Sequence, residues 1–237
     1  MRFDLYIFIP EIFITFWLIY LLIQFTLLTK RQYVFTFKNV KKTYIINPIP
    51  AITAFLLVLA IAYFFLQITG YSSYSTLSGL HCTPTLFYIK LLLSFIFILY
   101  IIYLRTNIQN LIFYSFEFYI ILFFAFISLN FLLISNNFLN IFLFIEIYSM
   151  CIYYLIASKK NSVKSIESAI KYFIFGSFSS AFLLFGMFLV YYTTGSINLV
   201  DISHLTFQNS YFKENMVYII GTYLISFSLL IKMGASF

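Results

Sequence analysis

Long apolar runs alternate with short polar segments along almost the whole chain. Seven runs approach or exceed the roughly 20 apolar residues that a helix needs to cross the hydrocarbon core of a bilayer. Their lengths favour helices over the alternating ten-residue strands of a membrane barrel. The pattern therefore predicts an all-α, polytopic bundle of about seven transmembrane helices, which we treat as one domain over residues 1–237. The predicted spans are 10–28, 50–69, 85–104, 111–134, 138–157, 168–192 and 216–237.

Composition supports an integral membrane protein, because 63% of the residues are hydrophobic and only 9% are charged. Residues 1–9 lead directly into the first run without a small-residue cleavage site, so we expect no removable signal peptide. The two cysteines, Cys82 and Cys151, form no spaced pair and indicate neither a disulfide framework nor a metal site.

The basic residues predict how the chain is oriented, since they gather on the side of the membrane where a protein is synthesised. Loops on one side carry nearly all of them, and the opposite loops carry only Lys213. Seven crossings then place the amino terminus on the outer side and the carboxyl terminus on the inner, basic side. This asymmetry accounts for the net charge of +7, so nucleic-acid binding is not needed to explain it. The residues on the basic side are Lys30, Arg31, Lys38, Lys41, Lys42, Arg105, Lys159, Lys160 and Lys164.

Two ionisable residues, Glu146 and Lys232, interrupt apolar runs at depth. Glu146 lies eight residues from one end of its predicted span and eleven from the other, close to the bilayer centre. Lys232 follows sixteen residues of predicted apolar helix. A charge inside the bilayer costs about 2.5 to 3.5 kcal/mol on insertion scales, so such residues usually face a protein interior or a water-lined path. Both therefore become candidates for proton transfer, although Glu146 could simply hold helices together and Lys232 could anchor the inner interface.

A glutamate and a lysine on neighbouring helices could act as a switch. Desolvation favours the neutral amine, whereas an approaching carboxylate favours the charged form. Joining or separating the two groups would then change whether the lysine keeps its proton.

Other polar residues carry weaker claims. We expect Lys90 to reach the outer surface along its flexible stem. Glu117 lies near the inner end of its span, either on a proton uptake path or at the interface. Glu167 and Lys171 are four residues apart, which favours a surface ion pair over a role for Lys171 in proton uptake. Small residues in the sixth span, which predict close helix packing, are Gly176, Ser177, Ser180 and Ala181.

Loop residues do not suggest a metal site. His81, Cys82, Asp201 and His204 lack the spacing of a ligand set. No glycine-rich phosphate loop, nucleophile elbow or cysteine cluster occurs in the sequence. We therefore expect this chain to bind no nucleotide, metal or redox centre.

One stretch resembles a known family. Residues 136–199 read NNFLNIFLFIEIYSMCIYYLIASKKNSVKSIESAIKYFIFGSFSSAFLLFGMFLVYYTTGSINL. This is similar to the NADH dehydrogenase subunit 2 family, the antiporter-like membrane subunits of respiratory complex I. The family places an acid on the fifth helix, then a basic loop, a pattern like S-x-E-A-x-x-K-Y-F-x-x-G-S-x-S-S and a TGS turn. The closing LLIKMGASF resembles its seventh-helix lysine motif, while IPEIF and EFYIILFFA resemble its first and fourth helices more loosely.

The resemblance implies a proton-translocating subunit of NADH:ubiquinone oxidoreductase in the mitochondrial inner membrane. Its amino terminus would face the intermembrane space and its carboxyl terminus the matrix. Glu146 and Lys232 would be the paired residues of its half-channel, with Glu117 and Lys171 as lesser candidates. NADH, FMN, iron–sulfur clusters and ubiquinone are then expected elsewhere in the complex, and neighbouring subunits 4L and 4, together with lipids, are the expected partners.

The resemblance also implies that the family fold continues past the lysine through further helices. We therefore interpret this chain as the N-terminal half of a split subunit, with a separate polypeptide supplying the rest. Two other functions remain open at this point. One is a component of a cation/proton antiporter, and the other is a structural membrane scaffold that conducts no protons.

Overall fold

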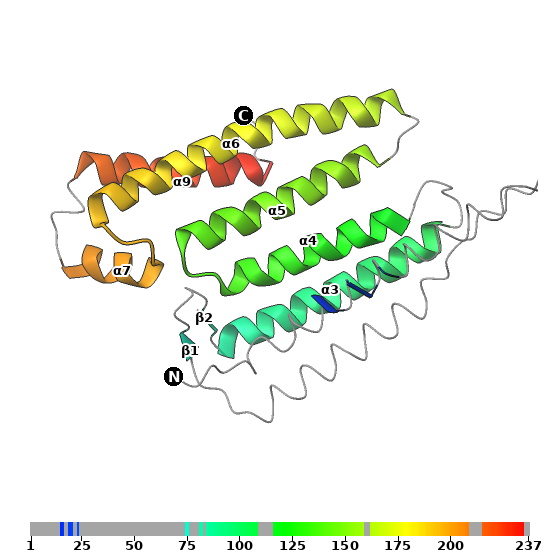
Figure 1. The fold of residues 1–237 in the computed structure, drawn as a ribbon, viewed down its shortest axis with the longest axis horizontal. Coiled ribbons are helices and arrows are strands. Elements are labelled where there is room, and N and C mark those ends of the chain that lie inside the picture. Colours follow the sequence, from blue (N-terminus) through cyan, green and yellow to red (C-terminus); the bar gives the residue numbers. More distant parts are fainter. Residues whose placement is uncertain are drawn as a thin grey trace, which may run out of the picture. The chain divides into compact units, whose positions relative to one another are not determined.

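The computed structural model describes residues 15–16, 19–20, 23, 74–75, 81–82, 84–108, 116–158, 162–208 and 215–234 (Figure 1). Six helices fall within this part of the chain, so the predicted all-α class is confirmed. They are α3 (Pro84–Ile108), α4 (Phe116–Ile134), α5 (Phe138–Ala157), α6 (Val163–Thr194), α7 (Leu199–Gln208) and α9 (Met216–Lys232). A two-stranded sheet joins β1 (Tyr74–Ser75) and β2 (His81–Cys82). The predicted spans 10–28 and 50–69 lie outside the described residues, apart from five positions in the first.

Two of the described helices, α5 and α6, are long and apolar enough to cross a membrane. The bounds of α5 coincide with the predicted 138–157, whereas α6 begins five residues before the predicted 168 and ends two residues after the predicted 192. α9 ends at Lys232, five residues short of the predicted 237, and the last three residues are not described. Shorter apolar helical stretches occupy Tyr88–Tyr103, Ile120–Ile134 and Met216–Lys232.

Individual residues explain where α9 begins and where α6 ends. Asn215 precedes α9, and its side chain accepts a hydrogen bond from the backbone N–H of Val217 at 3.1 Å, which satisfies one of the free donors of the first turn. Gly195 ends α6 with φ at 70°, a left-handed conformation that glycine adopts without a steric penalty. An antiparallel bridge between Asn137 and Asn198 then ties the chain before α7 to the start of α5.

The described residues divide into two compact units. The first contains α3 and α4 as far as Asn130, and the second contains the end of α4 together with α5, α6, α7 and α9. In the first unit, the ring of Phe97 stacks on that of Phe126, with centroids 4.2 Å apart.

The expectation that Lys90 reaches the surface is wrong, because only 3% of this residue is exposed. Lys90, Ser94, Phe97 and Ile101 are spaced four, three and four residues apart, so they share one face of α3. Ile101 and Ser94 are buried as well, which shows that this face is the inner one. Helix periodicity, rather than the length of the lysine stem, therefore decides where Lys90 lies.

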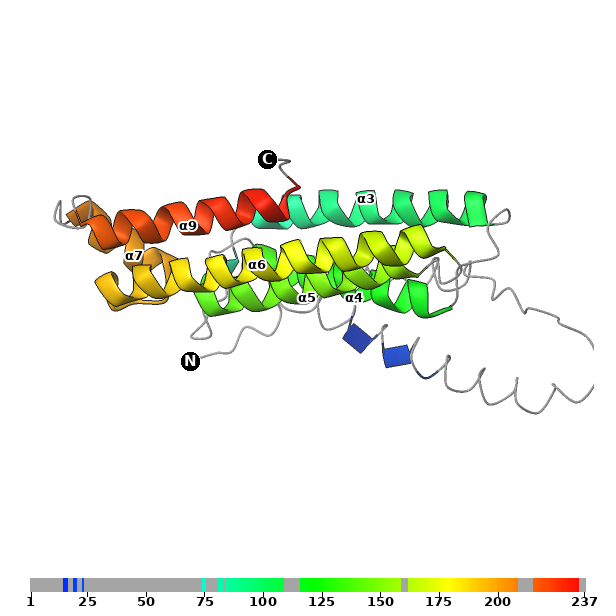
Figure 2. The same ribbon diagram turned by 90° about the horizontal axis from the view of Figure 1, so that it is seen from above.

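In the second unit α6 packs against both α5 and α9. Figure 2 shows α6 between these two helices, with α9 on the side away from α5. α6 and α9 approach closely at a pair of glycines. A Cβ on Gly186 would lie 2.9 Å from the carbonyl oxygen of Gly221, and a Cβ on Gly221 would lie 3.1 Å from that of Gly186. Only glycine fits at such a crossing without displacing a backbone.

The small residues predicted to mediate this packing are only partly those that do so. Ser177 and Ala181 are exposed, while Gly176 faces α5 instead of α9. The buried face of α6 consists of Ala169, Ser179, Leu183, Gly186, Met187 and Val190. The sequence identifies small residues on α6, but not which of them meet a neighbouring helix.

Candidate functional site: a glutamate–lysine pair across three helices

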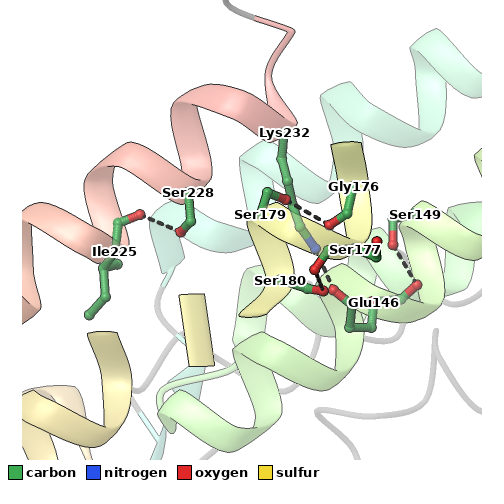
Figure 3. Close-up of polar contacts among 9 residues, drawn as sticks. All are labelled: Glu146, Ser149, Gly176, Ser177, Ser179, Ser180, Ile225, Ser228 and Lys232. Carbon is green, nitrogen blue, oxygen red and sulfur yellow. Dashed lines mark hydrogen bonds and ion pairs between the residues drawn. The ribbon is translucent and has the colours of Figure 1, made fainter. Parts of the chain in front are cut away.

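The two deep charges of the sequence meet in the second unit. Nζ of Lys232 lies 2.5 Å from Oε1 of Glu146 and donates a hydrogen bond to it (Figure 3). The glutamate comes from the middle of α5 and the lysine from the last residue of α9. Their side chains are 23% and 12% exposed in this chain. A pair separated by 86 residues in sequence thus forms a largely enclosed contact.

The intervening helix leaves room for the lysine to pass. Figure 3 shows its side chain running from α9 past Ser177, Ser179 and Ser180 of α6 towards Glu146. These α6 residues are small, so a four-carbon stem can cross the helix surface. The negative end of the α9 dipole also favours a cation in the last turn. The ion pair therefore depends on both the packing of α6 and the end of α9.

Serine hydroxyls lie on all three helices of the site, each hydrogen-bonded to its own helix. Ser149 donates to the carbonyl of Glu146 at 2.8 Å, and Ser179 donates to that of Gly176 at 2.9 Å. Ser180 donates to the carbonyl of Ser177 at 2.9 Å, and Ser228 to that of Ile225 at 2.7 Å. Such bonds satisfy the donors locally, as serines in apolar helices commonly do. The hydroxyl oxygens keep lone pairs that can accept a further hydrogen bond.

Of the lesser candidates, Lys171 contacts a different glutamate. Lys171 pairs with Glu167 at 2.5 Å, with side chains 67% and 58% exposed, which is the surface pair that their spacing predicts. Glu117 lies in the first turn of α4, and its side chain is outside the described part of the structure. His81 lies in β2, whereas Asp201 and His204 lie on α7, a helix that the sequence analysis did not predict.

Two residues of the site were missed from the sequence. Ser149 and Tyr153 follow Glu146 at three and seven residues, which places all three on one face of α5. The signal was present, because polar side chains at helical spacing from a buried acid mark a polar face in an otherwise apolar helix.

Comparisons with known proteins found one family and several relatives that are similar to part of this chain. Residues 135–237 match the family described as NADH:quinone oxidoreductase/Mrp antiporter, transmembrane. NADH-quinone oxidoreductase subunit N of Herminiimonas arsenicoxydans is 34% identical over 119 residues, which cover 50% of this chain and 24% of that protein. Subunit N 2 of Acidobacterium capsulatum is 45% identical over 87 residues, 37% of this chain and 18% of that protein.

Two solved structures share the fold over almost the whole chain. Respiratory complex I from Thermus thermophilus with bound aureothin contains a chain that matches with a TM-score of 0.60 and 20% identity, covering 95% of this chain and 43% of that one. The archaeal membrane-bound sulfane sulfur reductase matches with a TM-score of 0.63 and 19% identity, covering 96% and 44%. The chain thus spans less than half the length of these relatives. Residues 135–237 are thus similar to the NADH:quinone oxidoreductase/Mrp antiporter family, and these similarities support the resemblance to complex I antiporter-like membrane subunits that the sequence showed.

Proposed function

We propose that this chain translocates protons as a membrane-arm subunit of an NADH:quinone oxidoreductase, and that Glu146 and Lys232 carry the protons. The contact between these two side chains is the observation that supports the proposal most. It joins an acid and an amine from separate apolar helices, which a surface ion pair does not do. Relatives named as subunits of NADH-quinone oxidoreductase supply the context.

The chemistry follows from the pair. While the two groups are in contact, their hydrogen bond is a path for proton exchange between the carboxylate and the amine. When the groups separate, each can exchange a proton with another polar group or with water instead. Alternating between the two arrangements would load and unload a proton at mid-membrane. The chain itself would hold no redox centre, and NADH, FMN, iron–sulfur clusters and ubiquinone would bind to other subunits.

The finer assignments belong to the same proposal. We assign the chain to the mitochondrial inner membrane, with its amino terminus on the outer side and with subunits 4L and 4 as its neighbours. Mass spectrometry of the purified assembly would identify the neighbouring subunits, and the absence of subunits 4L and 4 would contradict this part of the proposal.

Proton pumping by the purified assembly in lipid vesicles tests the central claim. Glu146→Gln and Lys232→Gln should each abolish most pumping while the assembly still forms. Asp201→Asn and Lys164→Gln are matched controls, because both residues are exposed and the same groups are exchanged. Normal pumping in both site variants would refute the proposal and favour the structural scaffold.

A cation/proton antiporter component is the second candidate. It is supported by the family description, which includes Mrp antiporters beside NADH:quinone oxidoreductases. That function predicts sodium-dependent proton exchange without electron transfer, whereas the favoured function predicts proton movement that stops when quinone reduction is inhibited. The same vesicles distinguish the two.

A further inference from the structure

Tyr153 occupies an unusual position between α5 and α6. Its hydroxyl lies directly over the backbone of Gly176, where a Cβ would be only 1.7 Å from the hydroxyl oxygen and 2.7 Å from Cζ of the ring. Any other residue at 176 would therefore displace the phenol. The absence of a side chain at Gly176 creates a notch in α6, and the tyrosine hydroxyl fills it.

The ring is held in this place by aromatic neighbours. Tyr172 and Phe173 of α6 meet it edge-on, with centroids 5.2 and 5.6 Å away and interplanar angles of 79° and 88°. Edge-to-face contacts of this kind favour one ring orientation. The hydroxyl is thus fixed at the interface of the two helices instead of extending into lipid.

Tyr153 also lies near the charged pair. It follows Ser149 by about one turn on the same face of α5 and lies within electrostatic range of Glu146. Ser149 in turn lies one turn from the glutamate and bonds to its carbonyl. Glu146, Ser149 and Tyr153 therefore form a row of oxygens along one face of α5. The row extends about 10 Å along the helix axis at 1.5 Å per residue.

From Glu146, this row runs along α5 towards its carboxyl-terminal end, which precedes the basic residues near position 160 in the sequence. Two serine hydroxyls lie further along in this direction. The hydroxyl of Ser158 donates a hydrogen bond to the carbonyl of Leu155. The hydroxyl of Ser165 donates one to the carbonyl of Ile156 at 2.6 Å. Polar groups thus continue to the helix end, whereas the opposite half of α5, from 138 to 145, contains only Asn140 among polar residues.

We propose that the Tyr153 hydroxyl, seated over Gly176, passes protons between Glu146 and water at the end of α5 that precedes the basic segment. The inference rests on the proposed function and names a residue that the function requires. In each step the phenol oxygen accepts a proton from a hydronium ion, which is left as water, and the phenol gives its own hydrogen to Ser149. The serine hydroxyl does the same towards the Glu146 carboxylate. No bond other than O–H forms or breaks, no electron is transferred, and the phenol is neutral at the end.

A purely structural role for Tyr153 would give different behaviour. If the ring only fills the space between helices, its shape matters and its hydroxyl does not. Tyr153→Phe keeps the ring and removes the hydroxyl. Gly176→Ala keeps the hydroxyl and moves it, because the new methyl group occupies its place. The two variants therefore act on the same oxygen from two helices.

The test measures proton pumping per electron, and the solvent deuterium isotope effect on the pumping rate, in vesicles containing the complete assembly. Tyr153→Phe is expected to slow pumping about tenfold or more, as the loss of a positioned proton-transfer group does, and to change the isotope effect. Gly176→Ala should act in the same direction. Tyr192→Phe, at a residue that is 73% exposed on the same helix as Gly176, should behave as the unsubstituted protein does.

The outcomes separate this inference from the proposed function. Normal pumping and an unchanged isotope effect in Tyr153→Phe, with pumping lost in Glu146→Gln, would overturn the role of Tyr153 alone. Normal pumping in Glu146→Gln would overturn the proposed function itself. If Gly176→Ala does not assemble, Tyr153→Phe decides the question, because it leaves the aromatic packing in place.

Discussion

Removing both charges of the Glu146–Lys232 pair should cost less stability than the sum of the losses from the two single substitutions. At the observed separation of 2.5 Å, two unit charges attract by about 6 to 7 kcal/mol for an effective dielectric constant of 20. Desolvation of both groups offsets most of this gain, so the net value of the pair is far smaller. Removing one partner leaves the other charge in a largely enclosed site and typically costs about 3 to 5 kcal/mol.

A double-mutant cycle measures this coupling. Glu146→Gln and Lys232→Gln should each lower the free energy of unfolding by about 3 kcal/mol, whereas the double variant should lose at least about 2 kcal/mol less than the sum of the two. The assay is reversible unfolding of the full chain in mixed detergent micelles, followed by circular dichroism. Additive losses would show that the two side chains do not interact, and the contact on which the proposed site rests would be refuted.

Three further predictions address the supporting structure. Gly186→Ala should destabilise the chain by about 1 to 3 kcal/mol in the same unfolding assay, because the methyl group meets the carbonyl of Gly221 at 2.9 Å. Unchanged stability would contradict the close crossing. Asn215→Ala should cost about 1 kcal/mol, since it removes the cap on Val217, and Asn215→Asp should retain most of it. Glu167→Gln should change stability by less than about 0.5 kcal/mol, because its pair with Lys171 is exposed, and a larger loss would indicate an unrecognised role.

Sequence periodicity and apolar length suffice to place the described long helices, as α5 demonstrates. They do not reveal α7, which is only ten residues long and lies within a segment too short and too polar to resemble a span. The prediction that Lys90 reaches the surface was wrong, because it used only the distance of the lysine from the end of its span. That distance does not report which face of the helix the lysine occupies. Its spacing to Ser94 and Ile101 would have indicated burial.

The site was predictable as two residues but not as a contact. The free-energy cost of placing a charged side chain inside the bilayer is enough to identify Glu146 and Lys232 as candidate functional residues. Their meeting depends on the position of α9 relative to α6, which is set by the Gly186–Gly221 crossing. No single-sequence signal reports which glycines on two helices face each other. The spacing of Tyr153 from Glu146 indicates the face of α5 that it shares, but its contact with Gly176 on another helix could not be read from the sequence.

The packing of α6 restricts how the ion pair can open. Gly176 accommodates Tyr153 of α5 on one side, and Gly186 meets Gly221 of α9 on the other, so both neighbouring helices lie close to the α6 backbone. Ser179 of α6 and Ser228 of α9 are fully buried, which leaves little space for α9 to slide. Lys232, by contrast, ends its helix on a flexible four-carbon stem and is followed by Gly234 at a φ of 79°. This arrangement favours opening of the pair through the lysine side chain and the last turn of α9, while the three helices keep their contacts.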